Sequence, residues 1–150
     1  MRVVIQRVQR CSVEVEGKII GEIGKGLAIL LGVEEADTQE DIDWLCGKIS
    51  RLRIFDDENG VMNLDIQQAD GRAIVISQFT LYASTKKGNR PSYIRSAKEA
   101  ISRPMYERFL AALATTLGTE VEHGEFGADM QVSLVNDGPV TICIDSKNRE

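Results

Sequence analysis

Residues 26–33 read Gly26-Leu27-Ala28-Ile29-Leu30-Leu31-Gly32-Val33, a continuous apolar run with one glycine at its start and another near its end. A run of this length is typical of a strand, and the absence of polar positions indicates that both faces of the strand are buried. A second run, Ala73-Ile74-Val75-Ile76, has the same character. The two runs predict the covered middle of a β-sheet.

The segments before this run predict further strands. Residues 2–9 favour a strand, and in the next stretch Cys11, Val13 and Val15 alternate with polar residues, which is typical of a half-buried strand. Glu16-Gly17-Lys18 then predicts a hairpin turn.

The segment after residue 33 predicts the first helix. Asp37 is the expected start, and Glu40 three residues later completes a variant of the capping box. Cys46 lies in the apolar stripe of this helix, and nothing beside it would lower its thiol pKa, so it is interpreted as a core residue and not a nucleophile. The stripe consists of Ile42, Leu45, Cys46, Ile49 and Leu52.

A second helix is predicted from about residue 103 to residue 117. Ser102 is the expected N-cap, Pro104 is tolerated in the first turn, and Gly118 ends the helix. Its apolar stripe consists of Tyr106, Phe109, Leu110, Leu113 and Leu117.

The C-terminal third predicts a closing hairpin. Residues 130–134 and 140–144 both alternate between apolar and polar positions, and Asn136-Asp137-Gly138-Pro139 between them has the composition of a turn. Residues 146–150 are expected to form a loose tail.

These elements predict one α/β domain over residues 1–150, with mixed, mostly antiparallel β-sheet layers and two main helices on one side. Two helices cannot cover both faces of so many strands. One face should therefore pack against a second copy of the chain, which predicts a homodimer.

Composition narrows the class of protein. The chain is 43% hydrophobic and 27% charged, contains no apolar run long enough for a membrane span and shows no signal peptide, so no membrane partner and a cytoplasmic location are expected. Its 3 cysteines are widely spaced, and no pair has the spacing of zinc ligands. No metal and no cofactor are expected.

Charge is distributed unevenly along the chain. The net charge of −5 disfavours general attraction to nucleic acid and argues against DNA as a partner. Residues 84–108, however, carry seven Lys or Arg and two Glu, so this segment is +5 and the remainder −10. The loop containing Lys86, Lys87 and Arg90 is either a solvated loop or a local phosphate contact.

Standard catalytic sets are missing from the sequence. There is no Gly-x-Ser-x-Gly elbow, Walker loop or dinucleotide fingerprint, and His123 is the only histidine available to a Ser-His-Asp triad. Two unusual segments remain. Ser77-Gln78-Phe79-Thr80 is either an ordinary solvated strand end or a small polar site, and Gly138-Pro139 is either a plain turn or a cis pair.

These two segments together closely resemble the two signature motifs of bacterial D-aminoacyl-tRNA deacylases, historically called D-tyrosyl-tRNA deacylases. The resemblance extends over essentially the whole chain, and neither motif departs from the family pattern. It includes Ile5 to Val8, Arg53 to Phe55, Gly88 to Ser92, and Phe126 to Met130.

The resemblance implies a homodimer with each active site at the subunit interface. Gly138 and Pro139 would form a cis pair inserted into the partner's site, where it would exclude the side chain of an L-amino acid and still admit glycine. Arg7 would help to hold this pair. Phe126 and Met130 would line the pocket for the terminal adenosine of the tRNA, whose 3′-terminal aminoacyl-adenosine is the implied ligand.

An aminoacyl ester is already activated, so its hydrolysis requires mainly positioning, an oxyanion site and water. Ser77, Gln78, Phe79 and Thr80 are the predicted catalytic residues, with the backbone N–H groups around Phe79 and Thr80 as oxyanion donors. Two routes remain open: water activated with help from the ribose 2′-OH, or a Thr80 nucleophile.

Two other classes of function are also compatible with the residues. The chain could be a non-catalytic nucleic-acid-binding dimer that uses the basic loop at residues 86–90, or a structural dimer whose motifs serve only the interface. Release of free amino acid from D- and L-aminoacyl-tRNA distinguishes the three.

Overall fold

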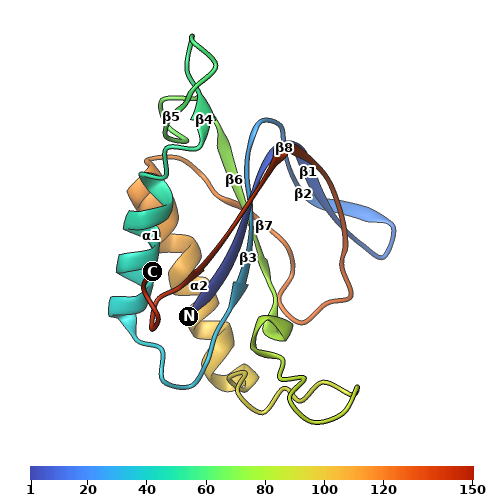
Figure 1. The fold of residues 1–150 in the computed structure, drawn as a ribbon. Helices are drawn as coiled ribbons and strands as arrows, with labels where there is room; N and C mark the ends of the chain where they lie inside the picture. The colour runs from blue at the N-terminus through green and yellow to red at the C-terminus, as the bar shows by residue number, and fades with distance from the viewer.

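Strand β1 (Arg2–Val15) connects most of the main sheet (Figure 1). Strand β8 (Gln131–Asp145) runs antiparallel along one side of β1. On the other side, the first half of β1 pairs with β3 (Gly26–Gly32) and the second half with β2 (Lys18–Ile23), both antiparallel. The structure, a computed structural model, describes all of residues 1–150.

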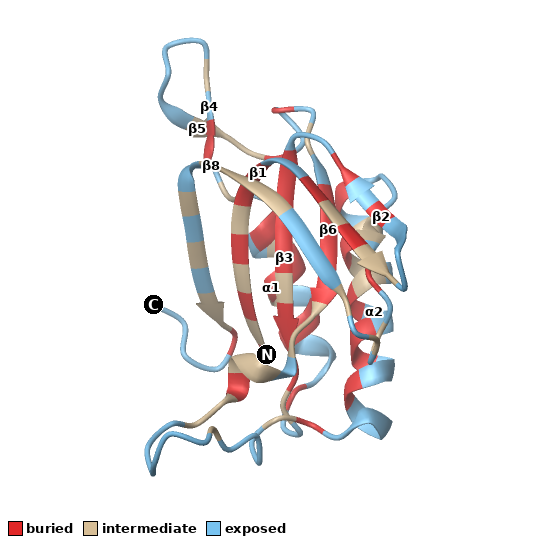
Figure 2. Cartoon of the chain, turned by 90° about the vertical axis from the view of Figure 1, so that its right-hand side faces the viewer, coloured by how far each residue is buried: buried red, intermediate tan, exposed pale blue.

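Beyond β3 the sheet continues with parallel pairing, to β6 (Arg72–Ser77) and then to the short β7 (Glu122–His123). A separate small hairpin consists of β4 (Phe55–Asp56) and β5 (Met62–Leu64). The predicted mixed, mostly antiparallel sheet is thus confirmed, and the two apolar runs are its buried β3 and β6, as predicted (Figure 2).

The two helices, α1 (Gln39–Ser50) and α2 (Glu99–Leu117), pack together on one face of the sheet, as predicted (Figure 1). They cover the larger core of 23 buried residues. The other face bends around a second core of seven residues. A Cβ on Gly21 would lie 2.6 Å from the carbonyl oxygen of His123, so β2 approaches β7 and the sheet is nearly closed like a barrel.

Helix α1 begins one residue later than predicted. Thr38 is the N-cap, and the Asp41 carboxylate accepts a hydrogen bond from the Thr38 N–H at 2.8 Å. The predicted pair of Asp37 and Glu40 was wrong, because Asp37 is engaged elsewhere. Its carboxylate accepts a bond from the Glu34 N–H at 2.9 Å and pairs with the amino group of Met1.

Helix α2 begins at Glu99, four residues before the predicted start, with Lys98 as its N-cap. Ser102 is not the cap. It lies inside the first turns and its hydroxyl donates to the Lys98 carbonyl at 3.1 Å, so it bonds within the helix instead of starting it. Gly118 ends the helix at φ 66°, as predicted.

The predicted C-terminal hairpin is wrong. Residues 131–145 form one strand, because each half finds the long β1 as its partner and does not fold back on the other half. Val8 pairs with Asn136 and Gln6 with Thr141, so residues 137–140 all lie opposite Arg7. The turn composition therefore produces a wide bulge, which we call the β8 bulge (residues 137–140).

The C-terminal residues are docked on the fold and do not form the expected loose tail. Ser146 is buried, and its hydroxyl donates to the Asp41 carboxylate at 2.6 Å. Lys147 bonds to the same carboxylate at 2.8 Å.

Neither helix has the combination of length and apolar character needed to span a membrane.

Candidate active site

A cleft of about 300 Å³ opens where β6 ends. Residues at the end of β6 and in the following turn form one side, and α2 with residues 126–132 forms the other. The lining residues are Leu31, Val33, Ile76, Ser77, Gln78, Phe79, Ser96, Ser102, Tyr106, Phe126, Gly127, Ala128, Met130 and Val132.

Five of the predicted site residues meet in this cleft: Ser77, Gln78 and Phe79 from one motif, and Phe126 and Met130 from another part of the chain. Thr80 follows directly in the 3₁₀ helix η1 (Phe79–Tyr82). Gly138, Pro139 and Arg7 do not line the cleft of their own chain.

The turn from β6 into η1 is held against the neighbouring strand. The Gln78 N–H donates to the Leu31 carbonyl at 2.8 Å, which extends the parallel pairing by one bond. Gly32 permits the approach, because a Cβ there would lie 3.1 Å from the Gln78 carbonyl oxygen and 3.3 Å from the Tyr82 ring. The end of β6 is thus held closely against β3.

Phe79 and Thr80 are the first residues of η1, and their N–H groups have no acceptor inside that helix. They are therefore free to donate to a ligand at the rim of the cleft. The Gln78 amide donates to the Thr80 hydroxyl, which leaves the hydroxyl hydrogen of Thr80 free. No carboxylate or imidazole bonds to Thr80, so no general base is positioned on it.

The opposite wall is aromatic. The rings of Tyr106 and Phe126 lie 5.5 Å apart, and the Arg103 guanidinium lies 4.8 Å from the Phe126 ring centre. The Tyr106 hydroxyl donates to the Val75 carbonyl at 2.9 Å, and burial raises the pKa of Tyr106, so the hydroxyl stays protonated as a donor. Tyr106 is thereby fixed against the sheet, and Phe126 packs beside it in the wall of the cleft.

Sequence reasoning missed three polar lining residues. Tyr106 was assigned to the apolar stripe of α2 and Ser102 to its cap, and Ser96 drew no attention. No sequence signal distinguishes Tyr106 or Ser102, because helical spacing is the same for a residue that packs on the core and for one that lines a cleft. Ser96 precedes the helix, and no motif marks it.

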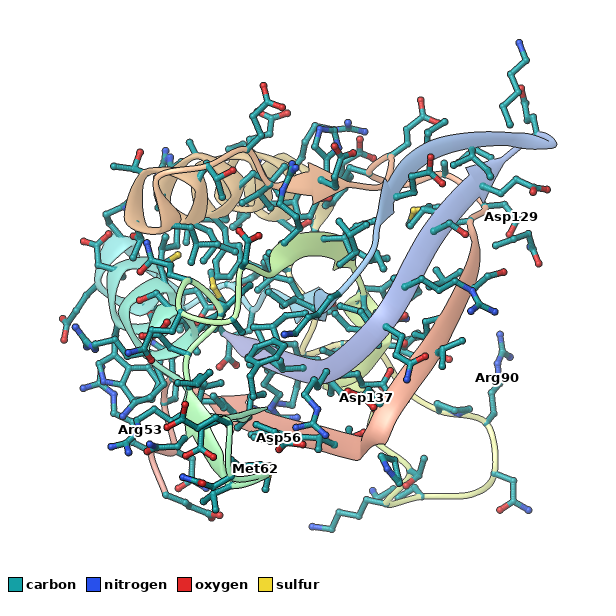
Figure 3. The ribbon with its side chains drawn as sticks, turned by 90° about the horizontal axis from the view of Figure 1, so that it is seen from above. Arg53, Asp56, Met62, Arg90, Asp129 and Asp137 are labelled. Atoms are coloured by element: carbon teal, nitrogen blue, oxygen red, sulfur yellow. The ribbon has the colours of Figure 1, made fainter.

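Arg7 lies beneath the β8 bulge and is 7% exposed. Its Nε donates to the Asp137 carbonyl at 3.2 Å, and its Nη1 donates to the Ile54 carbonyl at 2.6 Å and to the Asp56 carboxylate at 3.3 Å. Figure 3 shows Asp56 and Asp137 close together on β4 and on β8. Gly138 and Pro139 are exposed beside this cluster, and the peptide bond between them is cis, as the resemblance implies.

Cys46 and His123, the other residues considered as nucleophile and base, do not line the cleft. Cys46 is buried and burial raises the pKa of its thiol to about 12, which confirms that it is a core residue and not a nucleophile. His123 lines a separate cavity of about 500 Å³, and its Nδ1 lies 2.6 Å from the Gly124 carbonyl oxygen. No three His, Cys, Asp or Glu side chains gather in a way that could hold a metal ion.

Known proteins resemble this chain over nearly its full length. A family model of D-Tyr-tRNA(Tyr) deacylase matches residues 4–145. A D-aminoacyl-tRNA deacylase of Bacteroides fragilis (strain YCH46) is 65% identical over 150 residues, and one of Flavobacterium johnsoniae is 62% identical over 150 residues. Each alignment covers 100% of both chains.

Two solved structures share the fold. That of the c-Myc DNA Unwinding Element Binding Protein superimposes with a TM-score of 0.90 at 38% identity and covers 97% of this chain and 98% of that chain. That of a probable eukaryotic D-amino acid tRNA deacylase superimposes with a TM-score of 0.82 and covers 95% of this chain and 97% of that chain. At 15% identity, the second likeness concerns the fold alone.

Proposed function

Because this chain belongs to the D-Tyr-tRNA(Tyr) deacylase family, we propose that it hydrolyses the ester bond of D-aminoacyl-tRNA and releases a free D-amino acid and tRNA. The structural observation that carries this proposal is the pair of free N–H groups of Phe79 and Thr80 at the rim of the cleft.

These two N–H groups act as the oxyanion donors. Attack on the ester carbonyl places negative charge on its oxygen, and two fixed donors stabilise that charge without having to reorient. Their positions are set by β6 and by the Gln78–Leu31 bond, so they are rigid before the substrate arrives. Gln78 in turn orients the Thr80 side chain.

Water is the attacking group. The ribose 2′-OH beside the ester can take the proton from water and pass its own proton to the 3′-oxygen, which leaves as its bond to the carbonyl carbon breaks, whereas no carboxylate or imidazole bonds to Thr80. The alternative, covalent attack by the Thr80 hydroxyl, needs such a base on the protein. The surroundings of Thr80 therefore favour the substrate-assisted route.

Phe126 and Met130 bind the terminal adenosine. They lie on the wall opposite Ser77 and Phe79, and Phe126, whose ring packs against that of Tyr106, offers an apolar face to a flat nucleobase. Adenosine bound in this way brings the ester, which is attached to the same ribose, within reach of the N–H groups of η1.

Selection against L-aminoacyl esters comes from Gly138 and Pro139 of a partner subunit. Both residues are exposed and neither lines the cleft of its own chain, so a second copy is needed to bring them to the ester. Arg7 fixes the backbone beside them through the Asp137 carbonyl. A rigid barrier of this kind rejects an L side chain by steric clash and leaves room for hydrogen in the D ester or in glycyl-tRNA.

The test is release of free amino acid from D-tyrosyl-, L-tyrosyl- and glycyl-tRNA by the purified chain. We expect turnover of the D and glycyl esters and retention of the L ester. Absence of turnover of every ester, with the protein folded, would exclude the proposal.

One observation favours a second function. The relative of 38% identity is named for DNA binding, and this chain carries an exposed basic loop. The net charge of −5 opposes broad binding to DNA. Non-catalytic binding predicts steeply salt-dependent association with many nucleic acids and no ester turnover.

A further inference from the structure

Between η1 and α2 the chain forms an exposed loop with three cations that the proposed chemistry does not use. Ser84 and Ser92 close its base through two reciprocal backbone hydrogen bonds of 2.8 and 2.9 Å. Lys86, Lys87 and Arg90 lie between them, all exposed, and none forms an ion pair or a side-chain hydrogen bond within the protein.

Two arginines further along this segment, Arg95 and Arg103, are each paired with a glutamate, unlike the three loop cations. Arg95 pairs with Glu34 at 3.5 Å, and Arg103 pairs with Glu99 at 2.6 Å. Outside residues 84–108 the chain has a charge of −10. The loop is therefore a local positive region on an acidic protein, and it attracts a polyanion to this one place.

The loop is connected directly to the cleft. The ring of Tyr93, just past the loop, lies 5.0 Å from the ring of Phe79 in an edge-to-face arrangement. The following Ser96 lines the cleft, and the Ala97 N–H donates to the Val33 carbonyl at 2.9 Å. In Figure 1 the loop projects from the end of the molecule where η1 lies, and Figure 3 shows Arg90 on the side away from the helices.

We propose that Lys86, Lys87 and Arg90 bind backbone phosphates of the tRNA acceptor arm while its 3′ end occupies the cleft. The identification of the bound nucleic acid as tRNA rests on the proposed function. Contacts to phosphate fix the orientation of a nucleic acid without reading its sequence. The loop thus supplies affinity that is independent of the amino acid, and the cleft supplies selection at the ester.

The test compares two substrates that share the ester. One is D-tyrosyl-tRNA, and the other is D-tyrosyl-adenosine, which lacks the phosphates. The triple variant Lys86→Gln/Lys87→Gln/Arg90→Gln should lower kcat/KM on the tRNA by about tenfold or more near 0.1 M salt. It should leave kcat/KM on the adenosine ester unchanged.

Binding of uncharged tRNA gives a second readout that does not depend on turnover. The slope of log K against log salt should become shallower by roughly two to three in the variant, since each lost phosphate contact contributes about 0.7–0.9. A matched triple variant, Lys18→Gln/Lys48→Gln/Arg51→Gln, removes the same charge from the start of β2 and from the C-terminal end of α1. It should keep both the slope and kcat/KM.

Three results would overturn the proposal: an unchanged salt slope in the loop variant, equal losses in the loop variant and the matched variant, or equal losses on both substrates. Equal competition by duplex DNA and tRNA for the loop would overturn the assignment to tRNA. If the wild-type chain hydrolyses neither ester, the proposed function fails, and the binding slopes still decide whether the loop binds tRNA.

Discussion

Arg7 Nε lies 3.2 Å from the carbonyl oxygen of Asp137 and so ties the middle of β1 to the β8 bulge. The same guanidinium reaches the Ile54 carbonyl and the Asp56 carboxylate on the far side. One buried side chain therefore joins three segments that are distant in sequence.

Replacing Arg7 with Met should destabilise the fold by about 2–4 kcal/mol, because two backbone carbonyls and the facing carboxylates lose a buried charged donor. Urea denaturation measures this loss. Arg10→Met is the matched control, since Arg10 is exposed on the same strand, and it should change stability by less than about 0.5 kcal/mol. Under the proposed function, Arg7→Met also lowers the ratio of D-ester to L-ester hydrolysis, and an unchanged ratio would remove Arg7 from selection.

Thr80→Ala should retain measurable deacylation, with kcat reduced by no more than about tenfold, which corresponds to about 1.4 kcal/mol and so to the loss of one hydrogen bond. The reason is that water and the substrate hydroxyl carry out the attack. Single-turnover kinetics on D-tyrosyl-tRNA measure the rate, and Thr80→Ser serves as the control that keeps the hydroxyl. Complete loss in Thr80→Ala, with tRNA binding and folding intact, would instead identify Thr80 as the nucleophile.

Gly26→Ala should disrupt the pairing of β3 with β6. A Cβ at residue 26 would lie 1.7 Å from the Arg72 carbonyl oxygen, which is backbone and cannot move away without breaking the sheet. We expect a loss of about 3 kcal/mol or more, or failure to fold. Gly24→Ala is the control, because a Cβ there meets nothing within 4 Å and the protein should remain as stable as the wild type in thermal unfolding. Similar stability of the two variants would show that β3 and β6 do not approach as described.

Asp41→Asn should reduce stability at neutral pH by about 1–2 kcal/mol, since Asp41 accepts bonds from the helix N-cap and from the C-terminal residues. Burial alone raises the pKa of Asp41, but the bonds from Lys147, Ser146 and Thr38 outweigh burial and hold the pKa well below its usual value.

The sign of the pH dependence follows from that direction. A carboxyl whose pKa is lowered by folding contributes its full stability above its unfolded pKa of about 3.9 and loses it as the pH falls further. The difference in free energy of unfolding between wild type and Asp41→Asn should therefore be constant from pH 5 to 7 and shrink below about pH 4. Urea titrations at several pH values measure it, and a difference that grows on acidification would contradict the description of Asp41.

Most of the helices and strands could be predicted from local pattern. The apolar runs at residues 26–33 and 73–76 predicted the buried strands, because burial on both faces removes polar positions whatever the partner is. The residues that line the cleft were harder to predict from the sequence. Phe126 and Met130 were assigned through the resemblance, while Tyr106 and Ser102 carried only the marks of an ordinary helix.

The C-terminal third shows where local pattern fails. Asn136-Asp137-Gly138-Pro139 has the composition of a hairpin turn, but the same residue types also occur in a wide bulge. Which of the two forms depends on the strand with which the flanking residues pair, here β1. Likewise Asp37 and Thr38 are both good N-caps, and the contacts of Asp37 with the start of the chain leave the role to Thr38.

The sequence by itself determined most of the strands and helices and where the charges gather, since these follow from side-chain chemistry and spacing along the chain. The tertiary structure alone decided that β8 is continuous, that Arg7 lies under its bulge, and that residues 77–79 face residues 126–130 across one cleft. The physical reason is that such contacts depend on the long-range pairing of β1 with β3 and β8, and no local property of the chain specifies which distant backbone will supply the hydrogen-bond partners.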